Sequence, residues 1–250
     1  MSVLMALLVS PFNHLSAAPE KSVFRTRAHE NYRVAEAAYQ LNPTNITQAW
    51  QFGRACFDLA EFAENDPIRR DLAERGIGVC RAAIQLDPSN AAANLCLAMN
   101  LGQLARTKSL GALKIVREME SLFQKARTLD ERIDFGGPDR CLGLLYLEAP
   151  GWPASVGNRK KALFHLRRAV ELSPNYPGNR LELISALIQL RQPSEASREL
   201  STVRSLWSSA QSDLQGITWE GKWINWEVER RKLEAQLSRE LTPASAQPEK

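Results

Sequence analysis

The chain has 250 residues, 44% of them apolar and 24% charged. This composition excludes a disordered or membrane-embedded chain, and the length is enough to bury a core without disulfides. The formal net charge is only +4, and charges of both signs alternate along most of the expected helices. Such mixing is typical of solvated helix faces, so the sequence predicts no nucleic-acid partner.

The N-terminal segment, residues 1–18, contains no Asp, Glu, Lys or Arg. Its apolar run over residues 3–9 is too short to span a bilayer, and the small residues at positions 16–18 resemble a cleavage site. We therefore expect a signal peptide over residues 1–18 and a periplasmic or secreted mature chain without membrane insertion. The alternative is a loosely packed N-terminus of a cytoplasmic protein.

Helical periodicity follows, with apolar or small residues at three- and four-residue steps. The expected helices cover residues 23–41, 45–63, 67–86, 91–106, 110–129, 138–148, 158–172, 179–191, 194–207 and 218–240. Residues 241–250 have no apolar side chain larger than Ala apart from Leu241, and they are expected to form a disordered tail. One helical-repeat domain over residues 19–240 remains between the two terminal segments.

Four of these helices end in nearly the same way. The endings AYQLNP, AIQLDP, ARTLDE and AVELSP begin at Ala38, Ala83, Ala126 and Ala169, which are 45, 43 and 43 residues apart. A fixed period of this size indicates a stacked repeat of helix pairs. The helix that opens each following pair carries a small residue near its middle, namely Gly53, Ala98, Gly143 and Ala186. A lone pair cannot cover its apolar stripe, so we expect successive pairs to stack.

One unit resembles the tetratricopeptide repeat most closely. The segment CLGLLYLEAP followed by KALFHLRRAVELSPNYP has the small residue, aromatic, alanines and closing proline of that family at Gly143, Tyr146, Ala162, Ala169 and Pro174. The resemblance implies an all-α, tetratricopeptide-like α-solenoid of stacked antiparallel helix pairs. It also implies a protein-binding scaffold.

A second resemblance covers residues 30–230. The stretch FGGPDRCLGLLYLEAPGWPASVGNRKKALFHLRRAVELSPNYPGNRLEL, together with RACFDLAEFAEND and MNLGQLARTKSLGALK, is similar to the T component associated with TRAP-type solute transporters. It implies an exported, oligomeric accessory that partners a solute-binding protein and holds a small ligand. A generic protein-interaction scaffold without a transport role is the alternative.

The last expected helix carries an aromatic stripe. Trp219, Trp223 and Trp226 lie three and four residues apart, and Leu233 and Leu237 continue the same face. We interpret this helix as a cap that seals the open end of the array. An aromatic wall of a ligand channel is the alternative.

Motifs for catalysis or metal binding are missing from the sequence. The three histidines form no H-E-x-x-H pattern, and we expect His165 to be a solvated helical residue. The four cysteines lie in apolar helical patterns without a C-x-x-C pair, which predicts buried free thiols, with a Cys56–Cys80 disulfide as the alternative. DFGGPDR, from Asp134, is expected to form a turn that starts a helix. We therefore predict no enzyme activity, no cofactor and no metal site.

The resemblance also indicates a binding face. In tetratricopeptide proteins the first helix of each pair lines a concave groove, and the corresponding positions here are Trp50, Arg54, Phe57, Met99, Arg140 and Leu144. Core packing is the alternative for Trp50, Phe57 and Met99. The transport hypothesis adds Trp152, in the loop APGWPASVG, and Trp223. For Trp152 we favour another role, as a staple that pins its loop to the neighbouring pair.

Overall fold

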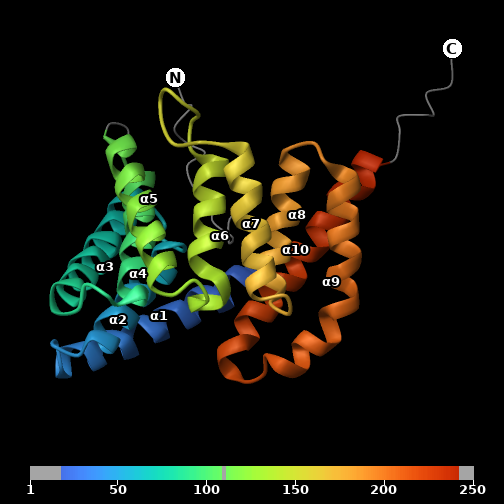
Figure 1. Cartoon of the computed structure of the whole chain (residues 1–250). Helices are drawn as coiled ribbons and strands as arrows, with labels where there is room; N and C mark the ends of the chain where they lie inside the picture. The colour runs from blue at the N-terminus through green and yellow to red at the C-terminus, as the bar shows by residue number, and fades with distance from the viewer. Residues whose placement is uncertain (1–17, 109–110, 242–250) are drawn as a thin grey trace, which may run out of the picture. The chain divides into compact units, whose positions relative to one another are not determined.

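The computed structural model of the chain describes residues 18–108 and 111–241, with side chains for all of these except residues 18–22 and 217–218. Within these ranges every regular segment is an α-helix, apart from one isolated bridge between Gly151 and Gly157. The prediction of an all-α chain is therefore confirmed (Figure 1). The helices are α1 (Ala18–Leu41), α2 (Ile46–Ala60), α3 (Asp66–Leu86), α4 (Ala91–Arg106), α5 (Ala112–Leu129), α6 (Ile133–Glu148), α7 (Arg159–Leu172), α8 (Pro177–Gln189), α9 (Pro193–Asp213) and α10 (Ile217–Leu241).

All ten expected helices are present in the described ranges, and most of their ends fall within a few residues of the expectation. The expected signal peptide over residues 1–18 and tail over residues 241–250 lie outside the described residues, except for Ala18 and Leu241, and stay predictions. No helix in the described part of the chain combines the length and the apolar character needed to cross a bilayer.

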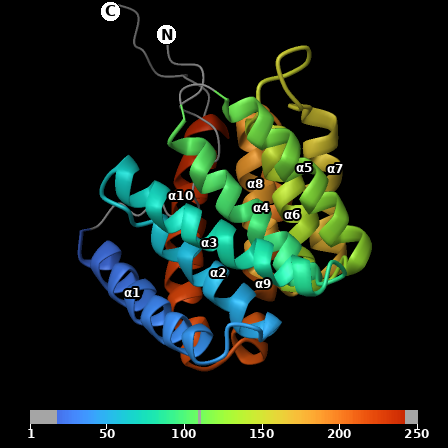
Figure 2. The same cartoon turned by 90° about the vertical axis from the view of Figure 1, so that its left-hand side faces the viewer.

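The chain divides into two compact units, the first ending at Leu172 and the second starting at Ser173. In the first unit each helix packs against the next one in the chain, from α1 to α7. Figure 2 shows α1, α2, α3 and α4 side by side in this order. In addition, α2 contacts α4, and α4 contacts α6, across neighbouring pairs. We call α2, α4 and α6 the inner helices, and α3, α5 and α7 the outer helices.

Asparagine side chains mark where several helices begin. Asn45, Asn65 and Asn90 each accept a hydrogen bond from a backbone N–H three residues later, at 3.1, 3.0 and 2.9 Å. These bonds satisfy N–H groups that have no partner within the helix. Asn45 and Asn90 come shortly after the Asn–Pro and Asp–Pro endings of the repeat, so one helix ends and the next is capped within a few residues.

Small residues bring the inner and outer helices close together. A Cβ atom at Gly53 would overlap Cys80 Sγ, and one at Gly76 would overlap the side chain of Asn100. At Gly143 a Cβ would lie 2.6 Å from Leu166 Cγ, closer than van der Waals contact allows. The small residues that recur with the period thus permit the close packing of successive helices.

The second unit contains α8, α9 and α10, and α10 packs against both of the others. Trp226, Leu233 and Leu237 of α10 are buried, and the Trp226 ring lies 5.1 Å from that of Tyr176 in an edge-to-face arrangement. The prediction of a capping helix is confirmed within this unit. The aromatic stripe of α10 forms the core of the unit because α8 and α9 alone leave an apolar face uncovered.

The four cysteines are free thiols. Cys56, Cys80 and Cys96 are buried, and Cys141 is half-buried. The alternative of a Cys56–Cys80 disulfide is therefore not realised. Burial raises the pKa of Cys56 and of Cys96 to about 12, and it raises the pKa of Cys80 as well.

Candidate functional site

The inner side of α2 carries the first three residues predicted for the binding face. Trp50, Arg54 and Phe57 are spaced four and three residues apart, so they lie along one side of the helix, and all three are half-buried. The rings of Trp50 and Phe57 also pack against the main core of the first unit. The core-packing alternative is thus partly correct for these two aromatic residues, while part of each ring stays exposed.

Arg54 and Arg140, far apart in the sequence, meet at one carboxylate. Arg54 Nε donates to Asp58 Oδ1 at 3.1 Å, and its Nη1 donates to Asp134 Oδ2 at 3.4 Å. Arg140 Nη2 donates to the same Asp134 oxygen at 2.6 Å. The carboxylate of Asp58 raises the pKa of Arg54, burial lowers it, and Asp134 raises it further, with a net rise. The guanidinium therefore stays charged and is held in a fixed orientation.

An unusual turn brings Asp134 to this position. Asp134, Phe135 and Gly136 have φ of 50°, 58° and 77°, so the chain makes a left-handed turn before the regular part of α6 begins. The Arg140 Nη1 group donates to the Asp134 carbonyl oxygen at 3.1 Å and so supports the turn. Left-handed backbone costs a non-glycine residue about 1 kcal/mol or more. The expected turn at DFGGPDR is confirmed, and Arg140 has a structural role in it.

Gly136 makes the turn possible at its tightest point. A Cβ at this residue would lie 3.2 Å from the Ala169 Cα of α7, and the positive φ also favours glycine. The sequence signal was the Gly136–Gly137–Pro138 run, which indicates a chain reversal but gives no direction for the Asp134 side chain. Sequence reasoning therefore missed Asp58 and Asp134 as the partners of the two arginines.

The two apolar residues predicted for the face lie in different surroundings. Met99 of α4 is only 9% exposed and belongs to the core, so it fills space between helices rather than facing a partner. Leu144 lies one turn after Arg140 on α6 and is half-buried. We define the inner face as Trp50, Arg54, Phe57, Arg140 and Leu144.

A buried ion pair that sequence reasoning did not predict joins α2 to α4. Glu61 follows the last residue of α2, and its side chain is 3% exposed. Its carboxylate accepts hydrogen bonds from Arg106 Nη1 at 3.2 Å and from the amide of Gln103. The pair fixes the relative position of the two inner helices at one end of the inner face.

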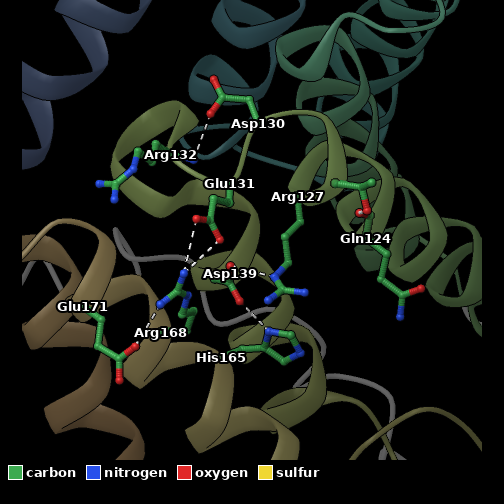
Figure 3. A network of polar contacts seen from close by, with 10 residues as sticks. Gln124, Arg127, Asp130, Glu131, Arg132, Asp139, His165, Arg168 and Glu171 are labelled. Carbon is green, nitrogen blue, oxygen red and sulfur yellow. Dashed lines mark hydrogen bonds and ion pairs between the residues drawn. The ribbon is translucent and has the colours of Figure 1, made fainter.

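A second polar network ties α5, α6 and α7 together. Figure 3 shows Arg127, Asp139 and His165 pointing toward one another. The carboxylate of Asp139 is fully buried, accepts from Arg127 Nε at 2.9 Å and lies 2.6 Å from His165 Nδ1. His165 also stacks on Tyr146, and its side chain is only 12% exposed. The prediction of a solvated His165 is therefore wrong, because the histidine is largely covered and links two helices.

The residues that the transport hypothesis added do not belong to the inner face. Trp152 is 88% exposed in the loop between α6 and α7, so the prediction that it pins this loop is wrong. Trp223 belongs to the second unit, where its Nε1 donates to the Leu214 carbonyl at 2.7 Å. It borders an open depression of about 500 Å³ near the turn that precedes α10. In the described part of the chain no group of three or more His, Cys, Asp or Glu residues is placed to hold a metal ion.

The helix pairs and their inner face define an α-solenoid of the tetratricopeptide type. A tetratricopeptide-repeat family model matches residues 155–205. A second family model, described as regulator of microtubule dynamics protein 1-3, matches residues 19–132, which span α1 to α5. The chain thus has a tetratricopeptide-like helical-repeat fold, and neither model names a transporter component.

Two solved structures are similar to this chain at low sequence identity. The thermophilic tetratricopeptide protein TTC0263 of Thermus thermophilus is similar with a TM-score of 0.63 and 15% identity, over 90% of this chain and 100% of that chain. The MamA structure has a TM-score of 0.48 and 15% identity, over 71% of this chain and 87% of its own. No curated protein sequence matches the chain. The similarity to TTC0263 confirms the fold alone.

Proposed function

We propose that the chain is a non-catalytic scaffold that holds a segment of a partner protein on its inner face. The observation that carries the proposal is the convergence of Arg54 and Arg140, from helices of two different pairs, beside half-buried aromatic rings. Arginine and tryptophan are the residues that most often anchor protein interfaces. The stacked pairs supply the fold that tetratricopeptide scaffolds use for such binding.

The fixed orientation of Arg54 favours binding. Its guanidinium is already held by Asp58 and Asp134. The Arg54 side chain therefore loses little conformational entropy when a partner forms a further hydrogen bond with it. The side chain is still 28% exposed, which leaves it accessible from one side. Arg140 is less exposed, at 13%, and supports the turn beneath. We therefore assign contact with the partner to Arg54 and positioning to Arg140.

The test compares two arginine variants in binding to a co-purified partner. Arg54→Ala is expected to weaken binding by about tenfold or more, because it removes an anchor of the interface. The matched control is Arg81→Ala, on the outer helix α3, where Arg81 is 54% exposed and pairs with Glu118 at 3.1 Å. Isothermal titration calorimetry measures both, and far-UV circular dichroism checks that each variant folds. Equal affinities for Arg54→Ala and the native chain would contradict the proposal.

A particular partner class is a second candidate. The family model described as regulator of microtubule dynamics protein 1-3 spans α1 to α5, which include two of the three inner helices. We propose polymerised tubulin as the partner to test first under this hypothesis. It requires the cytoplasmic location that was the alternative to export. Co-sedimentation with microtubules that is lost in Arg54→Ala would support this candidate, and a chain that stays in the supernatant would reject it.

The transport-accessory hypothesis remains a proposal with less support. It rests on the resemblance to the T component of TRAP-type transporters, and its ligand would bind at a site such as the open depression beside Trp223. It also requires a periplasmic location and a solute-binding protein as the partner. Native mass spectrometry of the purified chain tests it, because a bound small molecule would support this role and a ligand-free chain would count against it.

A further inference from the structure

Two aromatic side chains outside the inner face are exposed to solvent. Trp152, in the loop between α6 and α7, is 88% exposed, and Phe164 of α7 is 58% exposed. Single exposed apolar residues are ordinary on protein surfaces. These two flank the start of one outer helix, which is also the most cationic segment of the chain.

The loop that carries Trp152 is held closed by its backbone. Gly157 N–H donates to the Pro150 carbonyl at 2.9 Å, and Asn158 N–H donates to the Tyr146 carbonyl at 2.8 Å. A Cβ at Gly157 would overlap the Ala149 carbonyl oxygen, so the two sides of the loop approach as closely as glycine allows. Figure 1 shows the loop projecting beyond the ends of α6 and α7. The Trp152 ring therefore contributes little to closing the loop.

The charges in this segment all have one sign. Residues 149–170 contain five Lys and Arg and no Asp or Glu, although the whole chain has 32 basic and 28 acidic residues. Arg159, Lys160 and Lys161 follow one another in the first turn of α7 and are exposed. Among the described residues, none of the three has an ion pair with a carboxylate. Adjacent cations repel one another and also oppose the helix dipole at this end, so their clustering does not stabilise the fold.

One of the three cations has a defined position. The Lys161 ammonium lies over the Tyr146 ring, 4.9 Å from its centre, and Tyr146 is buried between α6 and α5. The next aromatic ring on the helix, Phe164, lies edge-on to His165 at 5.1 Å. We call Trp152, Arg159, Lys160, Lys161 and Phe164 the α7 patch. The patch combines three cations, one of them ordered, with the exposed aromatic rings of Trp152 and Phe164.

We propose that the α7 patch binds an acidic segment of a partner polypeptide. Carboxylates of the segment pair with Arg159, Lys160 and Lys161, and an apolar side chain of the segment packs on Trp152 or Phe164. The charge complementarity selects the partner, since an unpaired cationic cluster attracts acidic chains and rejects basic ones. The patch lies on an outer helix, so it is a second binding surface beside the inner face.

The test uses a fluorescein-labelled peptide of Glu and Asp with one central Phe, titrated with the full chain and followed by fluorescence anisotropy. We expect Lys160→Glu/Lys161→Glu to weaken binding by about tenfold or more, because each change turns an attraction into a repulsion. The matched control, Lys114→Glu/Arg117→Glu, makes the same charge change at exposed positions of α5 and is expected to stay within about threefold. Trp152→Ala, in an exposed loop position, is expected to weaken binding several-fold without affecting the fold.

Three results would overturn the proposal. Equal losses of peptide affinity in the two double variants would show that the peptide is attracted to the net charge of the chain and not to the α7 patch. No binding of the peptide by the native chain would exclude an acidic segment. Binding to phosphatidylcholine–phosphatidylserine vesicles in place of the peptide, lost in Lys160→Glu/Lys161→Glu, would assign the patch to a membrane surface. Arg54→Ala is expected to leave peptide binding unchanged, so failure at the α7 patch and failure at the inner face are separable.

Discussion

Asp139 illustrates how a single side chain can join three helices. Its carboxylate lies in α6, is fully buried, and contacts Arg127 of α5 and His165 of α7. A buried charge is tolerated only when it is paired, and removal of one member leaves the others without compensation. This network, together with the neighbouring pair Glu131–Arg168 at 3.1 Å, holds the outer helix α7 against the rest of its unit.

The stability of the first unit should depend on Asp139. We expect Asp139→Ala to lower the free energy of unfolding by about 3 kcal/mol, because it leaves a largely covered histidine and an arginine without their partner. Urea denaturation followed by circular dichroism measures the change. The control is Glu171→Ala, whose carboxylate is 64% exposed and pairs with Arg168 on the surface. That variant should lose about 0.5 kcal/mol or less, and similar losses in the two variants would show that the network adds nothing.

Thiol reactivity tests the burial of the cysteines. The raised pKa values of Cys56, Cys80 and Cys96 keep these side chains neutral at pH 8, where an ordinary thiol is partly ionised. In the folded chain we expect Ellman's reagent to modify only Cys141, which is half-buried, at a measurable rate. All four thiols should react in denaturant. Rapid modification of two or more thiols in the folded chain would contradict the packing of α2, α3 and α4.

At the scale of the helix, glycine positions decide how closely neighbouring helices pack. Gly76 and Gly78 both lie in α3, two residues apart. Gly76 is buried against Asn100, whose amide also donates to the Gly53 carbonyl of α2 at 2.8 Å. Gly78 is exposed and has no atom within contact distance of a Cβ. The two positions differ in packing while the local helix is the same.

This difference predicts opposite effects of one substitution. Gly76→Ala should lower the free energy of unfolding by about 1–3 kcal/mol, since the added methyl group displaces Asn100. Gly78→Ala should raise it by about 0.5–1 kcal/mol, because alanine restricts the unfolded chain and favours the helix. Thermal unfolding measured by circular dichroism compares the two variants. A stabilised Gly76→Ala variant would show that α3 and α4 are further apart than the structure places them.

At the scale of the whole molecule, features repeated along the sequence were predictable. The apolar periodicity predicted the ten helices, and the period of the four endings, three of which close on proline, predicted the stacking of helix pairs. The tryptophan stripe likewise predicted a covering role for α10, which it fills against α8 and α9. These features repeat or extend over many residues, so a wrong interpretation of one position does not change the predicted helices or their packing.

Features that depend on a single contact between residues far apart in the sequence were not predictable. Arg54 and Arg140 were both predicted for the binding face, but their link through Asp134 requires a left-handed turn whose direction the sequence does not specify. His165 was expected in solvent because its own helix is rich in Lys and Arg, but the buried partner comes from α6. Trp152 was expected to pin its loop to the neighbouring helix pair, whereas the side chain is exposed and the backbone of the loop closes without it.

The central claim is that the inner face of the first unit holds a partner polypeptide. Hydrogen–deuterium exchange of the chain with and without its co-purified partner tests the claim most directly, since a bound partner suppresses the local opening through which the backbone amides of the covered helices exchange. The account predicts slower exchange in α2 and in α6, around Arg54 and Leu144, with little change in α3. Protection confined to the outer helices, or no protection in the presence of a bound partner, would contradict it.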